Sequence, residues 1–175
     1  SEFFILNDKG EIVDNFRETF RTFLELNGIL YMEDAFGIQA IEFSSKREVW
    51  KLRTSERYTY APIFDNGEIF LKTRNIPSSI YSIDQYTGEI NWIAAQDAVS
   101  NLCLAGDRIY FTSSDGYLVA INRYSSIEVS RVKFSPQFDL DKQIGDYLIA
   151  CDRKNGILAV SFGDNTQIMG LRILN

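Results

Sequence analysis

The stretch IYSIDQYTGEINW, residues 80–92, decides the fold. Residues 80–84 are rich in the branched and aromatic side chains that are typical of a β-strand. A turn is expected next, because the Asp84 side chain can accept backbone N–H bonds ahead of the Thr87-Gly88 pair. A second strand is predicted at residues 89–93. The stretch therefore predicts two neighbouring antiparallel strands.

The residues before this stretch extend the predicted sheet. Residues 68–71 follow Gly67 and have the same strand composition, and residues 59–64 offer a further strand before that glycine. Residues 74–79, RNIPSS, join the predicted strands at 68–71 and 80–84. Such a connection is longer than a tight hairpin turn, so we expect it to protrude.

The same pattern recurs along the chain. Four glycines lie 39 residues apart, each ahead of a predicted strand: Gly28, Gly67, Gly106 and Gly145. A small residue recurs in the following strand, where close packing of stacked sheets excludes a larger side chain: Ala40, Ser82, Ala120 and Ala159. About four short strands in about 40 residues is the size of a propeller blade. The sequence predicts an all-β fold, a β-propeller-like array of four-stranded antiparallel blades.

The first residues, 1–16, read as half a blade. We expect a single propeller-like domain over residues 1–175 with about four and a half blades, in units at 1–16, 17–53, 54–94, 95–134 and 135–175. The half-blade would leave a strand edge that folded proteins cover. The chain can be the carboxy-terminal part of a larger propeller, which we favour, a homodimer joined edge to edge, or a closed five-bladed ring.

Residues 80–92, with 106–116, resemble the quinoprotein-like propeller family, whose PQQ-like repeats carry a strand, Tyr-Ala-Leu-Asp, Thr-Gly and then Trp. Trp50 holds the tryptophan position in the first full unit, and Ser130 and Gly170 stand near it in the last two. The resemblance implies the fold but not redox activity. Members that use pyrroloquinoline quinone hold it with calcium in a much larger propeller, often beside adjacent cysteines. We therefore predict no cofactor.

Composition narrows the function classes. The net charge of -6 disfavours nucleic acid and anionic membrane surfaces, because both need a basic protein surface. No apolar run reaches the roughly 20 residues that span a bilayer, so direct membrane insertion is not predicted. The chain has no histidine, which excludes Ser-His and Cys-His nucleophiles and histidine zinc sites within it. We predict no catalytic or metal site and no enzymatic activity.

Several residues whose side chains could react or bind a ligand are assigned structural roles. Cys103 and Cys151 lie in different units, so we expect small buried hydrophobes rather than a redox pair. Turn roles are assigned to Asp84, Asp115 and Asn155, and solvation to Asp139 and Asp141. Packing within or between blades is assigned to Trp50 and Trp92.

The candidate contact surface lies in loops. Connectors between units should emerge on one face of the blades, where propellers commonly bind partners. They carry five candidates: Arg57, Tyr58, Gln96, Asp97 and Gln137. The connection at 74–79 offers two more, Arg74 and Asn75, on the face where the central hairpins turn. Arginine and tyrosine are enriched at protein interfaces.

The sequence therefore favours a noncatalytic protein–protein interaction module or assembly scaffold with a protein partner. Three alternatives stay open: a propeller that binds a small ligand or sugar, a fragment of a quinone-dependent redox enzyme, and an acidic inhibitor of a basic protein partner. The compartment is not fixed by the sequence. The family resemblance is compatible with a periplasmic or extracytoplasmic location after removal of a signal.

Overall fold

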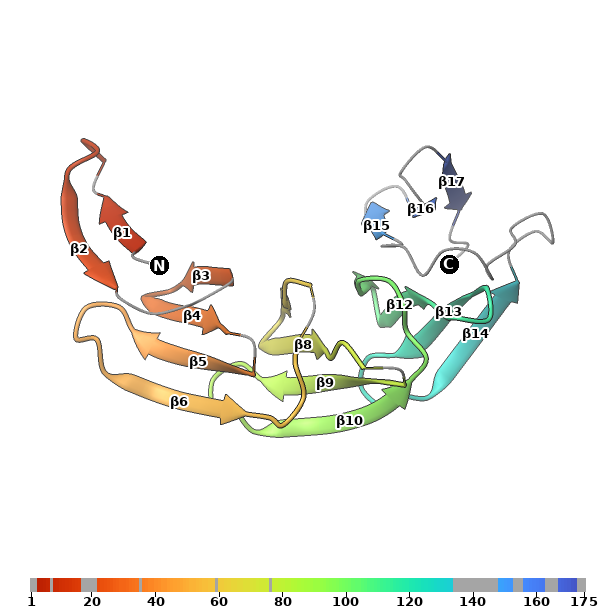
Figure 1. Ribbon diagram of the computed structural model, residues 1–175, viewed down its shortest axis with the longest axis horizontal. Helices are drawn as coiled ribbons and strands as arrows, with labels where there is room; N and C mark the ends of the chain where they lie inside the picture. The colour runs from red at the N-terminus through yellow and green to blue at the C-terminus, as the bar shows by residue number, and fades with distance from the viewer. Residues whose placement is uncertain are drawn as a thin grey trace. The chain divides into compact units, whose positions relative to one another are not determined.

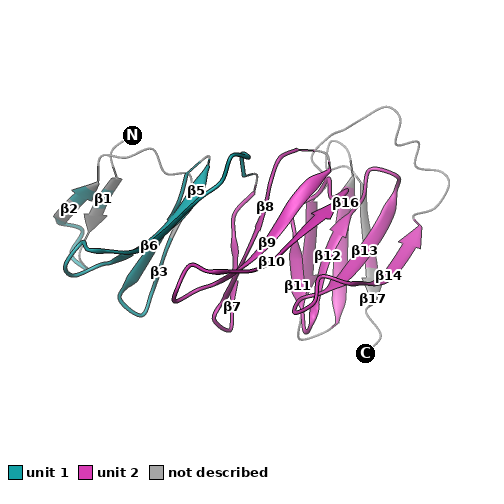
Figure 2. Cartoon of the chain, turned by 90° about the horizontal axis from the view of Figure 1, so that it is seen from below, with its two compact units in different colours: residues 1–58 teal, residues 59–175 magenta. Residues whose placement is uncertain are grey.

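The computed structural model describes residues 3–6, 8–16, 22–34, 36–58, 60–75, 77–133, 148–152, 156–162 and 167–172. The chain divides into two compact units, residues 1–58 and 59–175 (Figure 2). Several predicted features lie outside the described residues: Gly145, Gln137, Asp139, Asp141, Asn155 and the strand expected at residues 138–144.

The first unit contains two antiparallel sheets (Figure 1). The predicted half-blade is a two-stranded sheet of β1 (Phe3–Leu6) and β2 (Ile12–Phe16). The next sheet has four strands in sequence order: β3 (Thr22–Leu26), β4 (Ile29–Glu33), β5 (Gly37–Glu42) and β6 (Glu48–Arg53). Leu30 and Met32 are buried in this sheet with Ile41 packed against them.

The second unit contains three antiparallel sheets. One consists of β7 (Ile63–Asp65), β8 (Glu68–Lys72), β9 (Ser78–Asp84) and β10 (Ile90–Gln96). The next consists of β11 (Cys103–Ala105), β12 (Arg108–Thr112), β13 (Tyr117–Asn122) and β14 (Glu128–Lys133). The described part of the last consists of β15 (Leu148–Asp152), β16 (Ile157–Phe162) and β17 (Gln167–Arg172). The predicted fold class is confirmed: the chain is all-β, with blades of antiparallel strands.

Alternating side chains of β12 fill two separate cores in the second unit. Ile109 and Phe111 pack with Phe70 and Ile80 between the sheets β7–β10 and β11–β14, which we call the first seam. Tyr110 points the other way and packs with residues of β15 and β16 between β11–β14 and β15–β17, the second seam. The period of two thus places β12 in contact with both neighbouring sheets of the second unit.

The recurring small residues lie opposite the tryptophan position of the next strand. Ala40 pairs with Trp50 and Ser82 pairs with Trp92. Ala120 pairs with Ser130, and Ala159 pairs with Gly170, in the two units that lack the tryptophan. The register shifts by one residue next to this pair in the first three of these four sheets. A bulge of this kind increases the local twist of the strand.

The three equally spaced glycines that the structure describes occupy two different turn positions. Asn66 and Gly67 both have positive φ, 49° and 80°, as in a type I′ hairpin turn, and the turn at Asn27-Gly28 has the same form. Gly106, with φ of 60°, is instead the first turn residue, and Asp107 follows it, as in a type II′ turn. Gly67 and Gly106 are therefore not structurally equivalent, although both permit a tight hairpin.

Several strand boundaries differ from those predicted, and β10, for example, covers Ile90–Gln96 rather than residues 89–93. β7 and β11 begin at Ile63 and Cys103 rather than at residues 59 and 98. The Ser100 hydroxyl accepts the Thr112 N–H at 2.9 Å, so a side chain takes the place of a ladder bond before β11. β9 begins at Ser78, so the last two residues of the connection predicted at 74–79 belong to that strand.

The prediction that Cys103 and Cys151 form no pair is wrong. The two residues form a disulfide across 48 positions, with their Cα atoms 6.1 Å apart. Their strands belong to different sheets, but β11 and β15 lie side by side across the second seam. Cys103 is also buried in the apolar cluster there, so the expected burial of this residue is confirmed.

Candidate functional site

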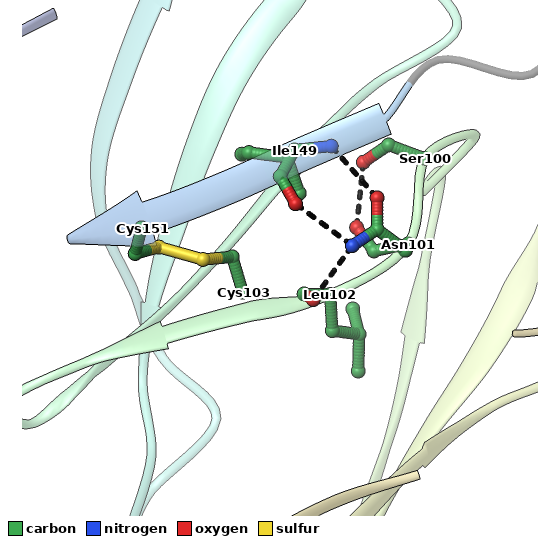
Figure 3. The surroundings of a disulfide bond; sticks show 6 residues. All are labelled: Ser100, Asn101, Leu102, Cys103, Ile149 and Cys151. Carbon is green, nitrogen blue, oxygen red and sulfur yellow. Dashed lines mark hydrogen bonds between the residues drawn. A yellow bond between two sulfur atoms is a disulfide. The ribbon is translucent and has the colours of Figure 1, made fainter. Parts of the chain in front are cut away.

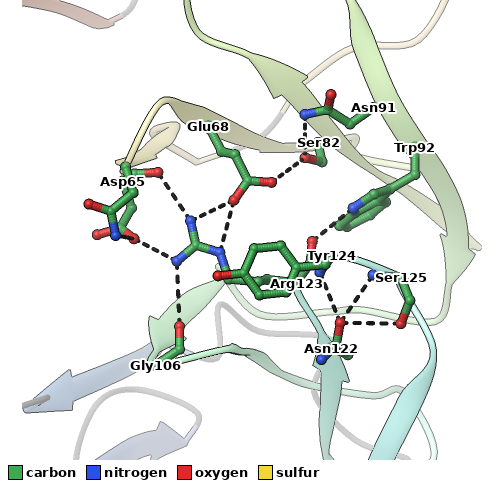
Figure 4. Close-up of polar contacts among 11 residues, drawn as sticks. Asp65, Glu68, Ser82, Asn91, Trp92, Gly106, Asn122, Arg123, Tyr124 and Ser125 are labelled. Carbon is green, nitrogen blue, oxygen red and sulfur yellow. Dashed lines mark hydrogen bonds and ion pairs between the residues drawn. The ribbon is translucent and has the colours of Figure 1, made fainter.

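A buried arginine joins the two sheets of the first seam (Figure 4). Arg123 follows β13 and is 3% exposed. Its guanidinium donates to Asp65 Oδ2 at 2.6 Å and to Glu68 Oε2 at 2.7 and 2.9 Å, both on the neighbouring sheet. Its Cζ atom lies 5.3 Å from the Phe70 ring centre. One arginine pairs with both carboxylates, so Asp65 and Glu68 are assigned to contacts between the two sheets and not to substrate binding.

Trp92 supports the same seam. Its indole Nε1–H donates to the Arg123 carbonyl at 2.8 Å, and its ring lies 6.1 Å from Phe70 with a tilt of 39°. The predicted role of Trp92 in packing between blades is confirmed. In the first unit Trp50 is buried against Tyr31, with ring centres 6.1 Å apart, so its predicted packing role is confirmed as well.

The turns after β9 and β13 use side-chain caps. Asp84 Oδ1 accepts the N–H groups of Tyr86 and Thr87 at 2.9 and 2.8 Å, which confirms its predicted turn role. The Thr87 N–H bond is the main reason why the pKa of Asp84 is lowered. Asn122 Oδ1 accepts the equivalent two N–H groups in the next sheet at 3.0 and 3.1 Å. Asp115 also lies in a turn, and its carboxylate pairs with Arg131 at 3.2 Å.

The second seam is held by a disulfide and an amide clamp (Figure 3). Next to the bond between Cys103 and Cys151, the Asn101 side chain binds both backbone groups of Ile149. Asn101 Oδ1 accepts the Ile149 N–H at 2.7 Å, and Asn101 Nδ2 donates to the Ile149 carbonyl at 2.9 Å. These bonds fix the first described strand of the last sheet against the sheet before it.

The connectors and central turns of the second unit meet at one end of its sheets. Asp97, in the connector after β10, accepts Oγ and N–H bonds from Ser114, which lies in the β12–β13 turn. Ser78, after the β8–β9 turn, donates its hydroxyl to the Gln96 carbonyl at 2.9 Å. We call this the connector end. It brings together two groups of candidates that the sequence assigned to separate loops.

The predicted contact residues differ in exposure. Arg74 and Asn75 are exposed in the β8–β9 turn, and the half-buried Gln96 and Asp97 lie beside that turn at the connector end. In the first unit Arg57 is exposed, with its Cζ 5.3 Å from the ring centre of the exposed Phe36. Tyr58 is 1% exposed, so its side chain does not lie on the surface.

Sequence reasoning missed two residues near the connector end, Lys72 and Tyr60. Lys72 Nζ lies 5.1 Å from the Tyr60 ring centre, and the lysine is buried at the end of β8. A charged residue directly after the apolar run Ile69–Leu71 was the available signal. The described residues contain no group of three or more His, Cys, Asp and Glu placed to hold a metal ion. In the same residues, no helix is long and apolar enough to cross a membrane.

Solved structures with a similar fold include both assembly factors and enzymes. BamB from Moraxella catarrhalis has a TM-score of 0.69 at 9% identity over 94% of this chain and 54% of its own. A quinohemoprotein alcohol dehydrogenase from Pseudomonas putida HK5 has a TM-score of 0.63 at 14% identity over 86% and 32%. The computationally designed protein Ika4 has a TM-score of 0.66 at 10% identity over 91% and 94%. At these identities the likeness shows the fold alone.

The chain spans about half the length of BamB and about a third of the dehydrogenase. A search of curated proteins found no significant match. The family model described as outer membrane protein assembly factor BamB matches residues 26–131, which include the first seam and the connector end. The chain belongs to this BamB family of PQQ-like repeat propellers.

Proposed function

We propose that this chain is a noncatalytic protein-binding segment of a propeller that serves as an assembly scaffold. The observation that carries the proposal is the family match over residues 26–131, since that family is described as an assembly factor. The carboxylates of the first seam support it, because Arg123 already engages Asp65 and Glu68. The likeness to a dehydrogenase adds no argument for redox chemistry, because it reflects the shared fold.

We place the contact surface of the second unit at the connector end. Arg74 and Asn75 are exposed there, and Gln96 and Asp97 lie beside them. Arginine supplies several donors at once and is enriched at interface hot spots. In the first unit Arg57 is a separate candidate, and Gln137 stays a prediction from the sequence. Tyr58 is left out, because its side chain is 1% exposed and carries no charge that would draw a partner group to it.

We further propose that the protein works in an oxidising compartment outside the cytoplasm. The support is the disulfide between Cys103 and Cys151, since such bonds persist in oxidising compartments and are rare in the cytosol. We also propose that the blades belong to a larger propeller. The fact that this chain matches 54% of the length of BamB supports that arrangement.

A photoreactive amino acid at position 74 or 75 tests the contact surface in cells. We expect both positions to cross-link to one defined partner. Glu89, exposed in the β9–β10 turn at the opposite end of the sheet, is the control position and should give no adduct with that partner. Equal cross-linking at positions 74 and 89, or none at 74 and 75, would contradict the proposal.

A charge reversal gives a second test with a matched control. Arg74→Glu should weaken capture of the cross-linked partner at least tenfold. Arg108→Glu makes the same change of charge at the first residue of β12, away from the connector end. Arg108 there pairs loosely with Asp107 at 3.8 Å, and the change should leave capture unchanged. Turnover of a small substrate by the purified chain would also count against a noncatalytic role.

A further inference from the structure

Lys72 is a buried cation at the connector end. It is the last residue of β8 and pairs with Ile80 in the register of the sheet. Only 5% of its surface is exposed, although Arg74, two residues later, is exposed. A buried ammonium group normally has a carboxylate partner, because removal of its charge from water is costly.

Among the described residues, none of the ion pairs includes Lys72. Its contact is with an aromatic ring, since Nζ lies 5.1 Å from the centre of Tyr60. Glu68, on the same face of β8, is engaged by Arg123. Burial lowers the pKa of Lys72 to about 8. Arg123, buried to a similar depth, has two carboxylates. Within the described part of the chain, Lys72 is therefore a buried cation without a counter-charge.

The ring below this cation is held in place. The Tyr60 hydroxyl donates to the Val99 carbonyl at 3.4 Å. Tyr60 also has a φ of 65°, in the left-handed region that a bulky aromatic residue rarely adopts. Strained backbone of this kind persists only where the surrounding structure enforces it. The lysine and the ring therefore form a fixed pair on neighbouring segments of one unit.

The neighbouring backbone groups indicate which anion fits. The Thr73 N–H donates to the Ser79 carbonyl at 2.9 Å, and the Ser79 N–H donates to Thr73 Oγ1 at 2.8 Å. These amides are occupied and do not form the nest of free N–H groups that commonly binds phosphate. The single positive charge of one ammonium group is balanced by the single negative charge of a carboxylate.

We propose that Lys72 and Tyr60 form a carboxylate-binding site at the connector end, occupied by an acidic side chain of a protein partner. The preference for a carboxylate follows from the buried cation. The choice of a protein as its source rests on the proposed function. The net charge of -6 does not oppose such a contact, because charges more than about 8 Å apart are largely screened at physiological salt.

Lysine titration followed by NMR tests the site directly. The whole chain, with its lysines carrying ¹³C-methyl groups, is titrated with the peptide acetyl-Gly-Glu-Gly-amide, with its Gln counterpart and with acetate. We expect the Glu peptide to raise the pKa of Lys72 by at least one unit in a saturable manner. By linkage, affinity should then fall by about tenfold for each unit of that shift as the pH rises from about 8 through the raised pKa, and stay level above it. The Gln peptide should have no effect.

Lys133 is the matched control, because its Nζ lies 5.8 Å from the Tyr117 ring while the lysine is exposed. Lys72→Met should weaken binding of the Glu peptide at least tenfold, whereas Lys133→Met should not. Lys72→Arg retains the charge and should bind within about threefold of the unchanged chain. Unchanged affinity in Lys72→Met, or equal binding of the Gln peptide, would overturn the site.

Two further outcomes separate the carboxylate site from the proposed function. Acetate that binds as tightly as the Glu peptide would overturn a protein source while leaving the site intact. Partner capture through position 74 that is unchanged by Lys72→Met would do the same. A shift of the Lys72 pKa by the Glu peptide, together with a partner whose capture depends on Lys72, would support both parts.

Discussion

The first and second seams of the second unit join equivalent blades by different chemistry. The first is held by a buried ionic cluster, in which Arg123 binds Asp65 and Glu68. The second is held by the Cys103–Cys151 disulfide and the Asn101 clamp on Ile149. Both also contain a continuous apolar core.

The hairpin turns explain why the ionic cluster cannot recur. Asp65 and Glu68 close the turn between β7 and β8, and the equivalent pair between β11 and β12 is Ala105 and Arg108. The second seam therefore has no carboxylates at these positions to receive an arginine. The sequence repeat determines which strands lie next to each other, but the polar or covalent link across each seam comes from residues that the repeat does not share.

Loss of the arginine should have the largest effect. Arg123→Met would remove the arginine that pairs with two largely buried carboxylates, at a cost of about 3–5 kcal/mol in unfolding free energy. Hydrogen exchange should report that loss at the amides of β8 and β12. Arg131→Met, which removes an exposed arginine that pairs with Asp115 and Glu128, should cost about 0–1 kcal/mol. Equal effects of the two variants would show that Arg123 is not a clamp.

Removal of the disulfide should rank next and affect the other seam. Replacement of Cys103 and Cys151 by alanine releases a cross-link over 48 positions, worth about 4 kcal/mol in the chain-entropy model. Exchange should accelerate in β15 and β16 and stay unchanged in β8 and β9. Acceleration that is equal in both regions would mean that the seams open together.

The amide clamp should contribute less. Asn101→Ala leaves the Ile149 N–H and carbonyl without their side-chain partner, at a cost of about 1–3 kcal/mol. Because Ile149 and Cys151 lie on the same strand, a double-mutant cycle with the cysteine variant should give a coupling of at least about 0.5 kcal/mol. Strict additivity would show that the clamp and the disulfide act independently.

The smallest effect concerns the turns next to the first seam. The pKa of Asp84 is lowered from its ordinary value of 3.8, chiefly by the Thr87 N–H bond. Its ionised form therefore stabilises the fold above that pH, and this stabilisation is lost as the pH falls through the lowered pKa. Asp84→Asn should reduce the acid sensitivity of unfolding below about pH 4, since Asn122 already makes these bonds without charge. An unchanged acid profile would contradict this role.

Local chemistry made much of the fold predictable. Strand composition located the β9 and β10 region, and the Asp84 turn followed from the ability of its carboxylate to accept nearby N–H groups. The recurring small residues were visible as well, but their pairing with the tryptophan position appears only in the register of the strands. These features depend on residues close together in the sequence.

The seams were not predictable, because their links join distant positions. Arg123 meets Asp65 and Glu68 across 58 and 55 positions, and nothing in the sequence of either segment indicates the other. The same holds for the disulfide. The burial of Tyr58 and Lys72 likewise depends on the surrounding fold. The sequence analysis therefore predicted Tyr58 to be a surface residue and did not identify Lys72.

The two kinds of hairpin turn have a consequence for anyone who would exchange or duplicate these blades. A module cut at each glycine would treat Gly67 and Gly106 as the same position, although one is the second turn residue and the other the first. The strand that follows the junction between two modules would then be displaced by one residue. Since side chains alternate, Tyr110 and Ile109 would exchange neighbours, and both cores would receive the wrong face. Modules should be cut at paired strand positions such as Glu68 and Arg108.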